Sequence, residues 1–169
     1  NKISFTVYVP SPPAHHYPEI PKTDWKVISA PAHLNGFEAW KAIDGDDSTM
    51  YHVPWSSATQ KPHDFIIDLG KEYSIREFYY KSRTIQGPPW EGRVRRFEVF
   101  LSNDSLNWSS QPALNGLFFR TDIWQYDLLP AVASGRYLKF SAKNSWYTPW
   151  DDADTLDIRT SIAEISLRG

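Results

Sequence analysis

Apolar and polar residues alternate with a period of two in several segments from Trp25 onward. Phe97 and Val99 fall on one side of an extended chain and Glu98 on the other, and residues 136–140 repeat this pattern. Successive side chains of a strand point to opposite faces of a sheet. Each such segment is therefore expected to be a strand with one buried face.

Eight segments rich in Ile, Val, Phe and Tyr are expected to be strands, and Gly, Pro, Asn and Asp separate them. No long amphipathic helix and no internal repeat is visible in the sequence. Many short strands with turn residues between them predict an all-β sandwich. The expected strands are 25–29, 64–69, 75–81, 94–102, 117–120, 123–128, 136–142 and 161–167.

The first part of the chain differs from the rest. Residues 3–9 could form a strand, and five prolines between positions 10 and 21 then predict an extended connector. We expect a Pro-rich lead-in over 1–22, which could end an upstream domain, and one β domain over 23–169, a length that suffices for a single core. The chain begins with Asn1 and carries no signal peptide, which indicates an excised piece of a longer protein.

The composition narrows the classes of function. A net charge of −2 predicts no basic surface for nucleic acid or anionic lipid. The absence of cysteine excludes a disulfide framework, a thiolate metal site and a cysteine nucleophile. No apolar run approaches the length of a membrane span. Aromatic residues make up 15% of the chain, so some rings are expected outside the core of what we expect to be a monomer.

Four motifs follow one another along the chain. They are KAIDGDDST at 41–49; DFIIDLG at 64–70; VRRFEVFLS at 94–102 with Asn107-Trp108; and GRYLKF at 135–140 with SIAEI at 161–165. Together, over about residues 24–169, they resemble the discoidin-like or coagulation factor 5/8 type C domains. Within that group the resemblance is strongest to family 32 carbohydrate-binding modules and the galactose oxidase N-terminal domain. It implies a galactose-binding-domain-like, jelly-roll-like β-sandwich of two antiparallel sheets, with the ligand site on loops at one end.

The first motif has the chemistry of a cation site. Asp44, Asp46, Asp47 and Thr49 bring carboxylates and a hydroxyl together around Gly45, which permits a tight turn. Ca²⁺ prefers such hard oxygen ligands. The spacing is not that of an EF-hand, and from these residues alone a solvated turn is the better explanation of the motif.

The resemblance implies that this loop and the last strand share a structural calcium ion with no catalytic role. The ion would join the two ends of the domain. Its implied ligands are the Lys41 carbonyl, Asp44, Asp46, Thr49, the Ala163 carbonyl and Glu164.

Proteins recognise sugars with planar polar side chains, which hold adjacent hydroxyls, and with aromatic faces, which stack on the ring. The resemblance implies that His52, after the calcium motif, and Arg83, at the end of a following strand, are the polar groups. Glu91 stands where many relatives carry Asn. An ionised carboxylate accepts hydrogen bonds from hydroxyls but donates none, which changes the contacts available to a galactose.

The long segment 144–160 is expected to supply the aromatic face, since loops of this length are often functional. Trp150 is favoured over Trp146 and Tyr147, and Trp55 and Trp90 on neighbouring loops could widen the platform. A loop tryptophan also commonly closes the end of a sandwich, which is the structural alternative for each. The rings read as core or strand-packing are Trp25, Trp40, Trp108 and Trp124.

The resemblance therefore implies a non-catalytic carbohydrate-binding module, tethered to a larger secreted, bacterial protein. That protein would be a glycoside hydrolase of the hexosaminidase or chitobiase type, placed outside the cell, in the periplasm or at the cell surface. Tethering would raise the local concentration of the enzyme at its glycan.

The sequence leaves two other functions open. One is a membrane- or protein-binding adhesion module of the discoidin type, which the acidic character of the last loop disfavours for anionic lipid. The other is a catalytic glycosidase segment, because paired carboxylates hydrolyse glycosides. The acidic residues in question, Asp151, Asp152, Asp154 and Asp157, are more typical of a solvated face.

Overall fold

The computed structural model describes residues 17–54, 61–83, 92–146 and 159–169. In these ranges the protein is all-β, with one short 3-10 helix, η1, as its helical element. No helix among the described residues is long and apolar enough to span a membrane. The elements are β1 (Lys26–Ser29), η1 (Ala39–Ala42), β2 (Tyr51–His52), β3 (His63–Lys81), β4 (Arg93–Val94), β5 (Arg96–Ser102), β6 (Leu114–Leu117), β7 (Trp124–Ala142), β8 (Ser145–Trp146), β9 (Ser161–Ile162) and β10 (Glu164–Arg168).

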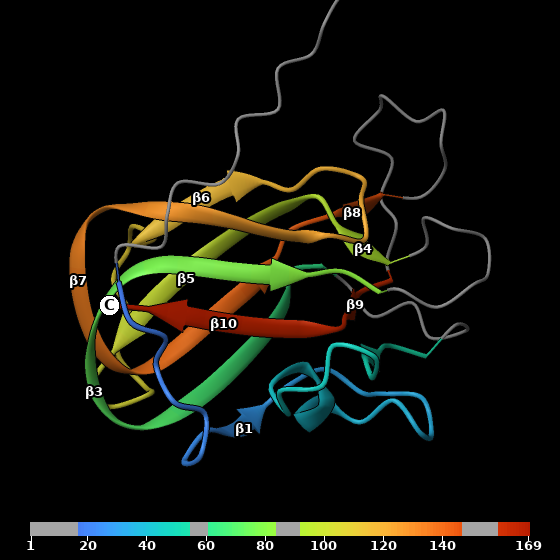
Figure 1. Cartoon of the computed structure of the whole chain (residues 1–169), viewed down its shortest axis with the longest axis horizontal. Helices are drawn as coiled ribbons and strands as arrows, with labels where there is room; N and C mark the ends of the chain where they lie inside the picture. Colours follow the sequence, from blue (N-terminus) through green and yellow to red (C-terminus); the bar gives the residue numbers. More distant parts are fainter. Residues whose placement is uncertain (1–16, 55–60, 84–91, 147–158) are drawn as a thin grey trace, which may run out of the picture.

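Two long strands, β3 and β7, form the frame of the large sheet, whose strand order is β1-β3-β7-β5-β6 with β10 also paired to β3 (Figure 1). The first half of β3 pairs with β1 and the second half with β10, while β7 follows it along both halves. The pairing register shifts between Asp68 and Tyr73. Gly70 lies there with φ +86, and a Cβ on it would come within 2.5 Å of the Asp24 Cβ. The strand therefore bends at a glycine, and the sheet curls around the core.

A smaller sheet has the order β2-β9-β4-β8 and consists of two-residue strands. Its β4 and β9 pair in parallel, whereas its other pairs are antiparallel as expected. In Figure 1, β4, β8 and β9 lie at the right-hand end of the long strands. This position is the end of the sandwich where the family resemblance implies a ligand site.

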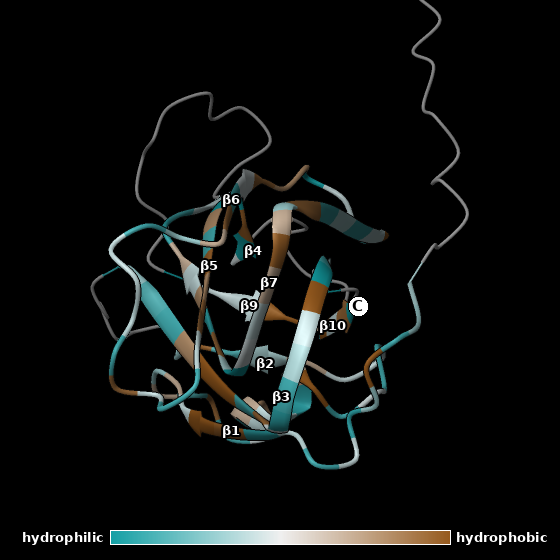
Figure 2. Ribbon diagram, turned by 90° about the vertical axis from the view of Figure 1, so that its left-hand side faces the viewer, coloured by the Kyte–Doolittle hydropathy of each residue, from teal (hydrophilic) through white to brown (hydrophobic). Residues whose placement is uncertain are grey.

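Aromatic rings fill the centre of the sandwich. Phe118 lies between Phe97, with ring centres 4.1 Å apart, and Tyr80, at 4.3 Å. Phe78 and Phe140 stack beside them with ring centres 5.4 Å apart. Apart from Phe118, which is 3% exposed, these side chains are at most 1% exposed. Hydrophilic and hydrophobic residues interchange along β3, so one strand supplies both core and surface (Figure 2).

The all-β prediction is confirmed, and three corrections to the expected strands follow. The expected strands 64–69 and 75–81 form the single strand β3, and 123–128 and 136–142 form β7. Pro130, which donates no backbone hydrogen bond, lies within β7 where the pairing with β3 is irregular between Leu128 and Ala133. The expected strand 117–120 is wrong, because β6 ends at Leu117.

Residues 17–22, part of the predicted lead-in, lie against β10. Ile20 is 3% exposed, and its backbone N–H donates to the Leu167 carbonyl at 2.9 Å. Glu19 forms a bridge with Arg168, and the Gly169 N–H donates to the Pro18 carbonyl at 3.2 Å. Both ends of the described chain therefore meet beside the last strand. Residues 1–16 lie outside the described residues.

Candidate functional site

Four residues form one row across the small sheet. His52 pairs with Ser161, Ser161 with Arg93, and Arg93 with Trp146. Residues directly opposite one another on neighbouring strands project to the same face. Three strand spacings of about 4.8 Å give the row a backbone span of roughly 14 Å. His52, Ser161 and Arg93 are at most 6% exposed, so the row is a buried polar layer.

The His52 imidazole has a defined orientation. Its Nδ1 lies 2.5 Å from the Val53 carbonyl oxygen, and its ring meets Phe37 edge to face with centres 6.3 Å apart. A carbonyl only accepts hydrogen bonds, so Nδ1 carries the proton. In the neutral ring Nε2 is then an acceptor, which suits a hydroxyl donor.

Arg93 ties the end of β3 to the row. Its Nη2 donates to the Arg83 carbonyl at 2.9 Å, and its Nε donates to Ser82 Oγ at 3.1 Å. Arg83 and Arg93 are 4% and 6% exposed, and burial lowers the pKa of Arg93. Arginine has so high an ordinary pKa that both guanidinium groups remain cationic at neutral pH. Two buried cations therefore stand side by side at this end of the sandwich.

A glycine allows the strands of the row to approach closely. Gly92 precedes β4 with φ +76, and a Cβ there would lie 3.1 Å from the Ser161 backbone nitrogen. The Ser161 N–H donates to the Gly92 carbonyl at 2.7 Å. The Ser161 hydroxyl is buried and has no hydrogen-bond partner among the described residues.

Trp146 is held firmly at the other end of the row. Its Nε1 donates to the Phe118 carbonyl at 3.1 Å. The guanidinium carbons of Arg95 and Arg120 lie 4.6 Å and 4.5 Å from a ring centre of the indole. Because a cation over an indole face is attractive, these contacts fix the ring and gather positive charge beside the row.

The structure thus brings His52, Arg83 and Trp146 to the same end of the sandwich. The sequence interpretation did not include Arg93 or Ser161. The signal for Arg93 was present, since it directly follows the Glu-Gly pair at 91–92. Nothing in the local sequence marked Ser161 as their neighbour. The predicted contacts that lie outside the described residues are Trp55, Trp90, Glu91, Tyr147 and Trp150.

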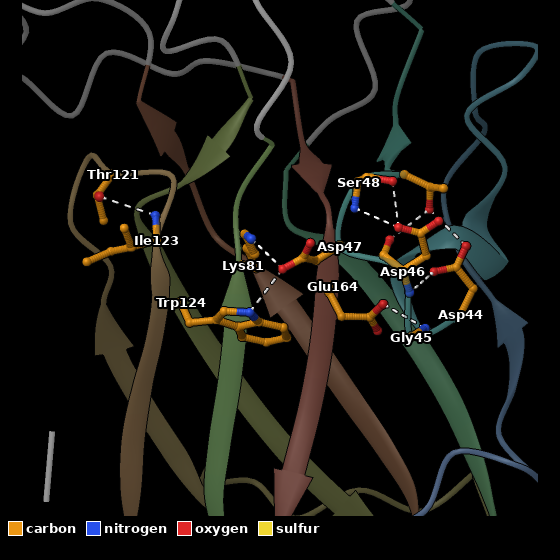
Figure 3. A network of polar contacts seen from close by, with 11 residues as sticks. Asp44, Gly45, Asp46, Asp47, Ser48, Lys81, Thr121, Ile123, Trp124 and Glu164 are labelled. Atoms are coloured by element: carbon orange, nitrogen blue, oxygen red, sulfur yellow. Dashed lines mark hydrogen bonds and ion pairs between the residues drawn. The ribbon is translucent and has the colours of Figure 1, made fainter.

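The loop 44–49 follows η1 and is organised by its own carboxylates (Figure 3). Asp44 accepts the Asp46 backbone N–H at 2.9 Å and the Thr49 hydroxyl at 2.8 Å. Asp46 accepts the Ser48 N–H at 3.0 Å and hydroxyl at 2.6 Å, and the hydroxyl bond is the main reason why its pKa is lowered. The loop is therefore preformed around hard oxygen atoms.

Glu164 connects this loop to β10. It is 1% exposed, and its Oε2 accepts the Gly45 N–H at 2.8 Å. Its Oε1 accepts from the Lys22 ammonium at 2.5 Å. Burial raises the pKa of Glu164, and Lys22 opposes that rise. The two implied carbonyl ligands are Lys41, in η1, and Ala163, just before β10, and η1 contacts β10.

Asp47 turns away from the other loop carboxylates. It pairs with the Lys81 ammonium and accepts the Trp124 indole N–H at 3.2 Å (Figure 3). Within the described ranges, no three His, Cys, Asp or Glu side chains are gathered as a metal cluster would gather them. Asp44, Asp46 and Glu164 are instead positioned by the hydrogen bonds given above.

Comparison with known proteins identifies the family. The family model of the F5/8 type C domain matches residues 27–156. The chain belongs to the F5/8 type C domain family.

Among curated proteins, this F5/8 type C domain is similar to galactose oxidase of Gibberella zeae. The two are 29% identical over 151 residues, which cover 88% of this chain and 20% of the oxidase. It is also 29% identical over 106 residues to a sialidase of Micromonospora viridifaciens, covering 62% of this chain and 16% of the sialidase. The domain therefore spans about a fifth of the length of these relatives.

Solved structures share the fold of this F5/8 type C domain. The third family 32 module of a Clostridium perfringens family 31 glycoside hydrolase has a TM-score of 0.76 and 21% identity, covering 89% of this chain and 94% of that one. The family 32 module of C. perfringens NanJ gives 0.71 and 20%, with coverage of 89% and 98%. The C-terminal domain of a Bacteroides fragilis chitobiase gives 0.74 and 21%, with coverage of 90% and 97%.

The tryptophans of the F5/8 type C domain depart from the predicted division into core and loop. Trp25 is 7% exposed, as expected of a core ring. Trp40 is 54% exposed and Trp124 39%, so reading them as packed rings is wrong. Trp40 lies on η1, where the alternation of strands does not apply, and Trp124 begins β7 at the surface.

Proposed function

We propose that this domain is a non-catalytic carbohydrate-binding module. The observation that carries the proposal is the buried polar row of His52, Ser161, Arg93 and Trp146, with Arg83 fastened to Arg93. Sugar sites combine a few convergent polar groups with aromatic walls. The row supplies an imidazole, a hydroxyl and guanidinium groups beside an indole.

Each group in the row has a partner on a pyranose. A guanidinium donates two hydrogen bonds in a fixed fork, which suits two adjacent hydroxyls. His52 Nε2 can accept a hydrogen bond from a sugar hydroxyl when the ring is neutral. Hydrolysis of a glycoside usually requires two carboxylates on either side of the bond. The row and Arg83 supply two guanidinium groups, a hydroxyl, an imidazole and an indole, which supports binding over catalysis.

Known structures with this fold support a glycan ligand. The NanJ module was solved with galactose, another C. perfringens module with GalNAc-β-1,3-galactose, and the AlyQ module with 4,5-unsaturated mannuronic acid. We infer that the chain serves a larger protein acting outside the cell, such as a glycoside hydrolase of the chitobiase or hexosaminidase type. The B. fragilis chitobiase domain and the M. viridifaciens sialidase support that inference.

A glycan array tests the proposal, with the wild-type chain beside Arg83→Ala and a control, Arg136→Ala. Arg136 is a partly exposed arginine paired with Asp68 in the large sheet. Wild type and Arg136→Ala should bind one glycan class, and Arg83→Ala should lose at least about tenfold in affinity because charged hydrogen bonds contribute about 1.5–3 kcal/mol. A folded wild-type chain that binds no glycan on the array would refute the proposal.

We further propose that the loop 44–49 and Glu164 hold a structural calcium ion. The donor set fits, because each side chain offers a hard oxygen and the Gly45–Glu164 hydrogen bond joins the loop to β10. Asp44, Asp46, Thr49 and Glu164 would bind through side-chain oxygens, with the Lys41 and Ala163 carbonyls completing the shell. The ion would stabilise the fold and take no part in chemistry.

Thermal unfolding with calcium and with a chelator tests the metal. Calcium should raise the melting temperature of the wild type by several degrees, since a ligand that binds only the native state stabilises it. Asp46→Asn should abolish the rise, and Asp104→Asn, a turn carboxylate between β5 and β6, should retain it. Equal melting curves with calcium and chelator in the wild type would count against the ion.

One observation favours a second candidate, an adhesion module. Phe119 and Ile123, on the segment between β6 and β7, are 78% and 64% exposed. Large exposed apolar side chains mark contact surfaces when they cluster. Sedimentation with phospholipid vesicles that is lost in Phe119→Ala, together with an empty glycan array, would favour this function.

A further inference from the structure

A cavity of about 740 Å³ lies beside β1, apart from the buried polar row. Its walls include Lys22 and Trp25 from the segment before β1, Lys26 from β1, Trp40 from η1, and Asp44. None of these residues belongs to the small sheet. In Figure 1, β1 lies at the lower edge of the sandwich, away from β4, β8 and β9. The volume is within the range of about 300–1,000 Å³ found for small-molecule sites.

The two indoles of this cavity differ in a way that suits a ligand. Trp25 is 7% exposed and belongs to the core, so it is a rigid part of the wall. Trp40 is 54% exposed, and the Lys41 ammonium lies 5.6 Å from its ring centre. An exposed indole face stacks well on the apolar C–H surface of a sugar ring.

The cavity wall also carries two cations, Lys22 and Lys26, together with the Asp44 carboxylate. The Lys22 ammonium is committed to Glu164 at 2.5 Å. Lys26 is exposed, and none of the ion pairs among the described residues includes it. Its cross-strand neighbour Asp68 is already bound by both Arg136 nitrogens, at 2.8 and 2.9 Å. Lys26 helps to lower the pKa of Asp68 but forms no ion pair with it. An ammonium and a partly exposed indole in the walls of one cavity favour a ligand that has a carboxylate and an apolar ring face.

We propose that this cavity is a second saccharide subsite, selective for sugars that carry a carboxylate. The pyranose ring stacks on Trp40, and the carboxylate pairs with Lys26. The subsite extends the proposed function to a second point on the same glycan class, and it shares no residue with the buried polar row. It can therefore be present or absent independently of the row.

Titration of the ¹⁵N-labelled chain, in calcium buffer, tests the subsite through the Trp40 indole N–H resonance. The probes are tetragalacturonate, its methyl ester and sialyllactose. At least one acidic probe should shift the resonance, and the ester should shift it far less. Trp40→Ala should weaken binding of that probe about tenfold, through loss of ring contact. Lys26→Ala should weaken it about two- to fivefold, as for an exposed ion pair. Lys71→Ala, an exposed lysine outside the cavity, should match the wild type.

The failure of this subsite is distinguishable from the failure of the proposed function. If no acidic probe shifts Trp40, or if Arg83→Ala abolishes the binding while Trp40→Ala retains it, the subsite is wrong and the row can still be a glycan site. If acidic probes bind through Trp40 and Lys26 while the array shows no dependence on Arg83, the subsite stands and the row does not bind. Lys26→Ala changes an exposed side chain, so this variant reports binding even if Trp40→Ala unfolds.

Discussion

The long strands of the large sheet and the short strands of the small sheet are stabilised by different interactions. The β3 and β7 strands have 19 residues each, pair along most of their length, and bury stacked aromatic rings. The small sheet has two-residue strands, and its centre holds buried polar groups, among them His52, Arg93 and Ser161. Strands so short contribute few ladder hydrogen bonds. The side-chain hydrogen bonds of Arg93 and Trp146 therefore also anchor the small sheet to the segments that follow β3 and β6.

This difference predicts that mutations in the large sheet change stability without changing ligand affinity, whereas mutations in the small sheet change both. A change in the apolar core should cost stability without a specific effect on binding. A change in the small sheet or in the adjoining loop 44–49 should affect both. Four experiments test this contrast.

The largest expected effect comes from Phe140→Ala in β7. Phe140 is fully buried and stacks on Phe78, so its removal should lower the free energy of unfolding by about 3–5 kcal/mol. Glycan affinity of the folded fraction should equal that of the wild type. Guanidinium unfolding and glycan titration measure the two quantities. Leu128→Ala, at a partly exposed position of the same strand, should cost under about 0.5 kcal/mol.

Lys22→Met should have the next largest effect, and it should depend on calcium. With a chelator the free energy of unfolding should fall by about 2–3 kcal/mol, because Glu164 is left buried without its cation. With calcium the fall should be under about 1 kcal/mol, because the proposed ion supplies the missing charge. Chemical unfolding in both buffers measures this, with Lys143→Met, from the exposed pair with Glu98, as control. Equal losses in the two buffers would contradict the proposed calcium site.

Arg93→Lys sharpens the comparison within the small sheet. Lysine keeps the charge but loses the fork that binds the Arg83 carbonyl and Ser82, so we expect a loss of about 1–2 kcal/mol in stability. Unlike Phe140→Ala, this variant should also bind glycan more weakly in its folded fraction. Denaturant unfolding and the same glycan titration provide both values. The exposed Arg96→Lys in β5 is the matched control, and unchanged affinity in Arg93→Lys would separate the row from binding.

The smallest effect concerns a polar pair on the large sheet, Asp68 with Arg136. The Arg136 hydrogen bonds hold the pKa of Asp68 below its ordinary value of 3.8. The resulting stability is fully present above that pH and is lost as the pH falls through the lowered pKa. Arg136 is 44% exposed at its side chain, so Asp68→Asn should cost only about 0.5–1 kcal/mol at neutral pH. Melting curves from pH 7 to 2 should show the difference from the wild type shrinking below pH 3.8. If the difference in stability between Asp68→Asn and the wild type did not change with pH, the loss would arise from a contact other than the Asp68–Arg136 pair.

The large sheet was predictable because its alternation is local. The alternation at Phe97 and Val99 predicts the buried face of β5 from a few residues, and both side chains are buried in the structure. The local sequence did not predict that β3 and β7 are continuous strands. Gly70 bends β3 without ending it, and Pro130 lies within β7 without ending it. This continuity depends on the partner strand, because the pairing of β3 with β7 accommodates an irregular register at both places.

The small sheet was harder to predict from the sequence, because a strand of two residues is too short to show a periodic pattern. The resemblance implied His52 and Arg83, and the structure places His52 in the row and Arg83 beside it, where their sugar contacts remain predictions. Arg93 and Ser161 meet through a parallel pairing of β4 with β9, which no local pattern encodes. Trp40 was misread because a single turn of η1 has no strand-like alternation to guide the assignment.

The chain order of the row has a consequence for synthesis. His52, Arg93 and Trp146 emerge from the ribosome in that order, while Ser161, which stands between the strands of the first two, comes last. A nascent chain that ends at β8 can already pair β4 with β8, but β2 has no neighbour in the small sheet until β9 arrives. Contacts between distant segments form slowly, because a long loop must close first. The pairing of β3 with β7 can therefore form during translation before β9 is made, whereas the proposed glycan site becomes functional only after β9 has left the ribosome.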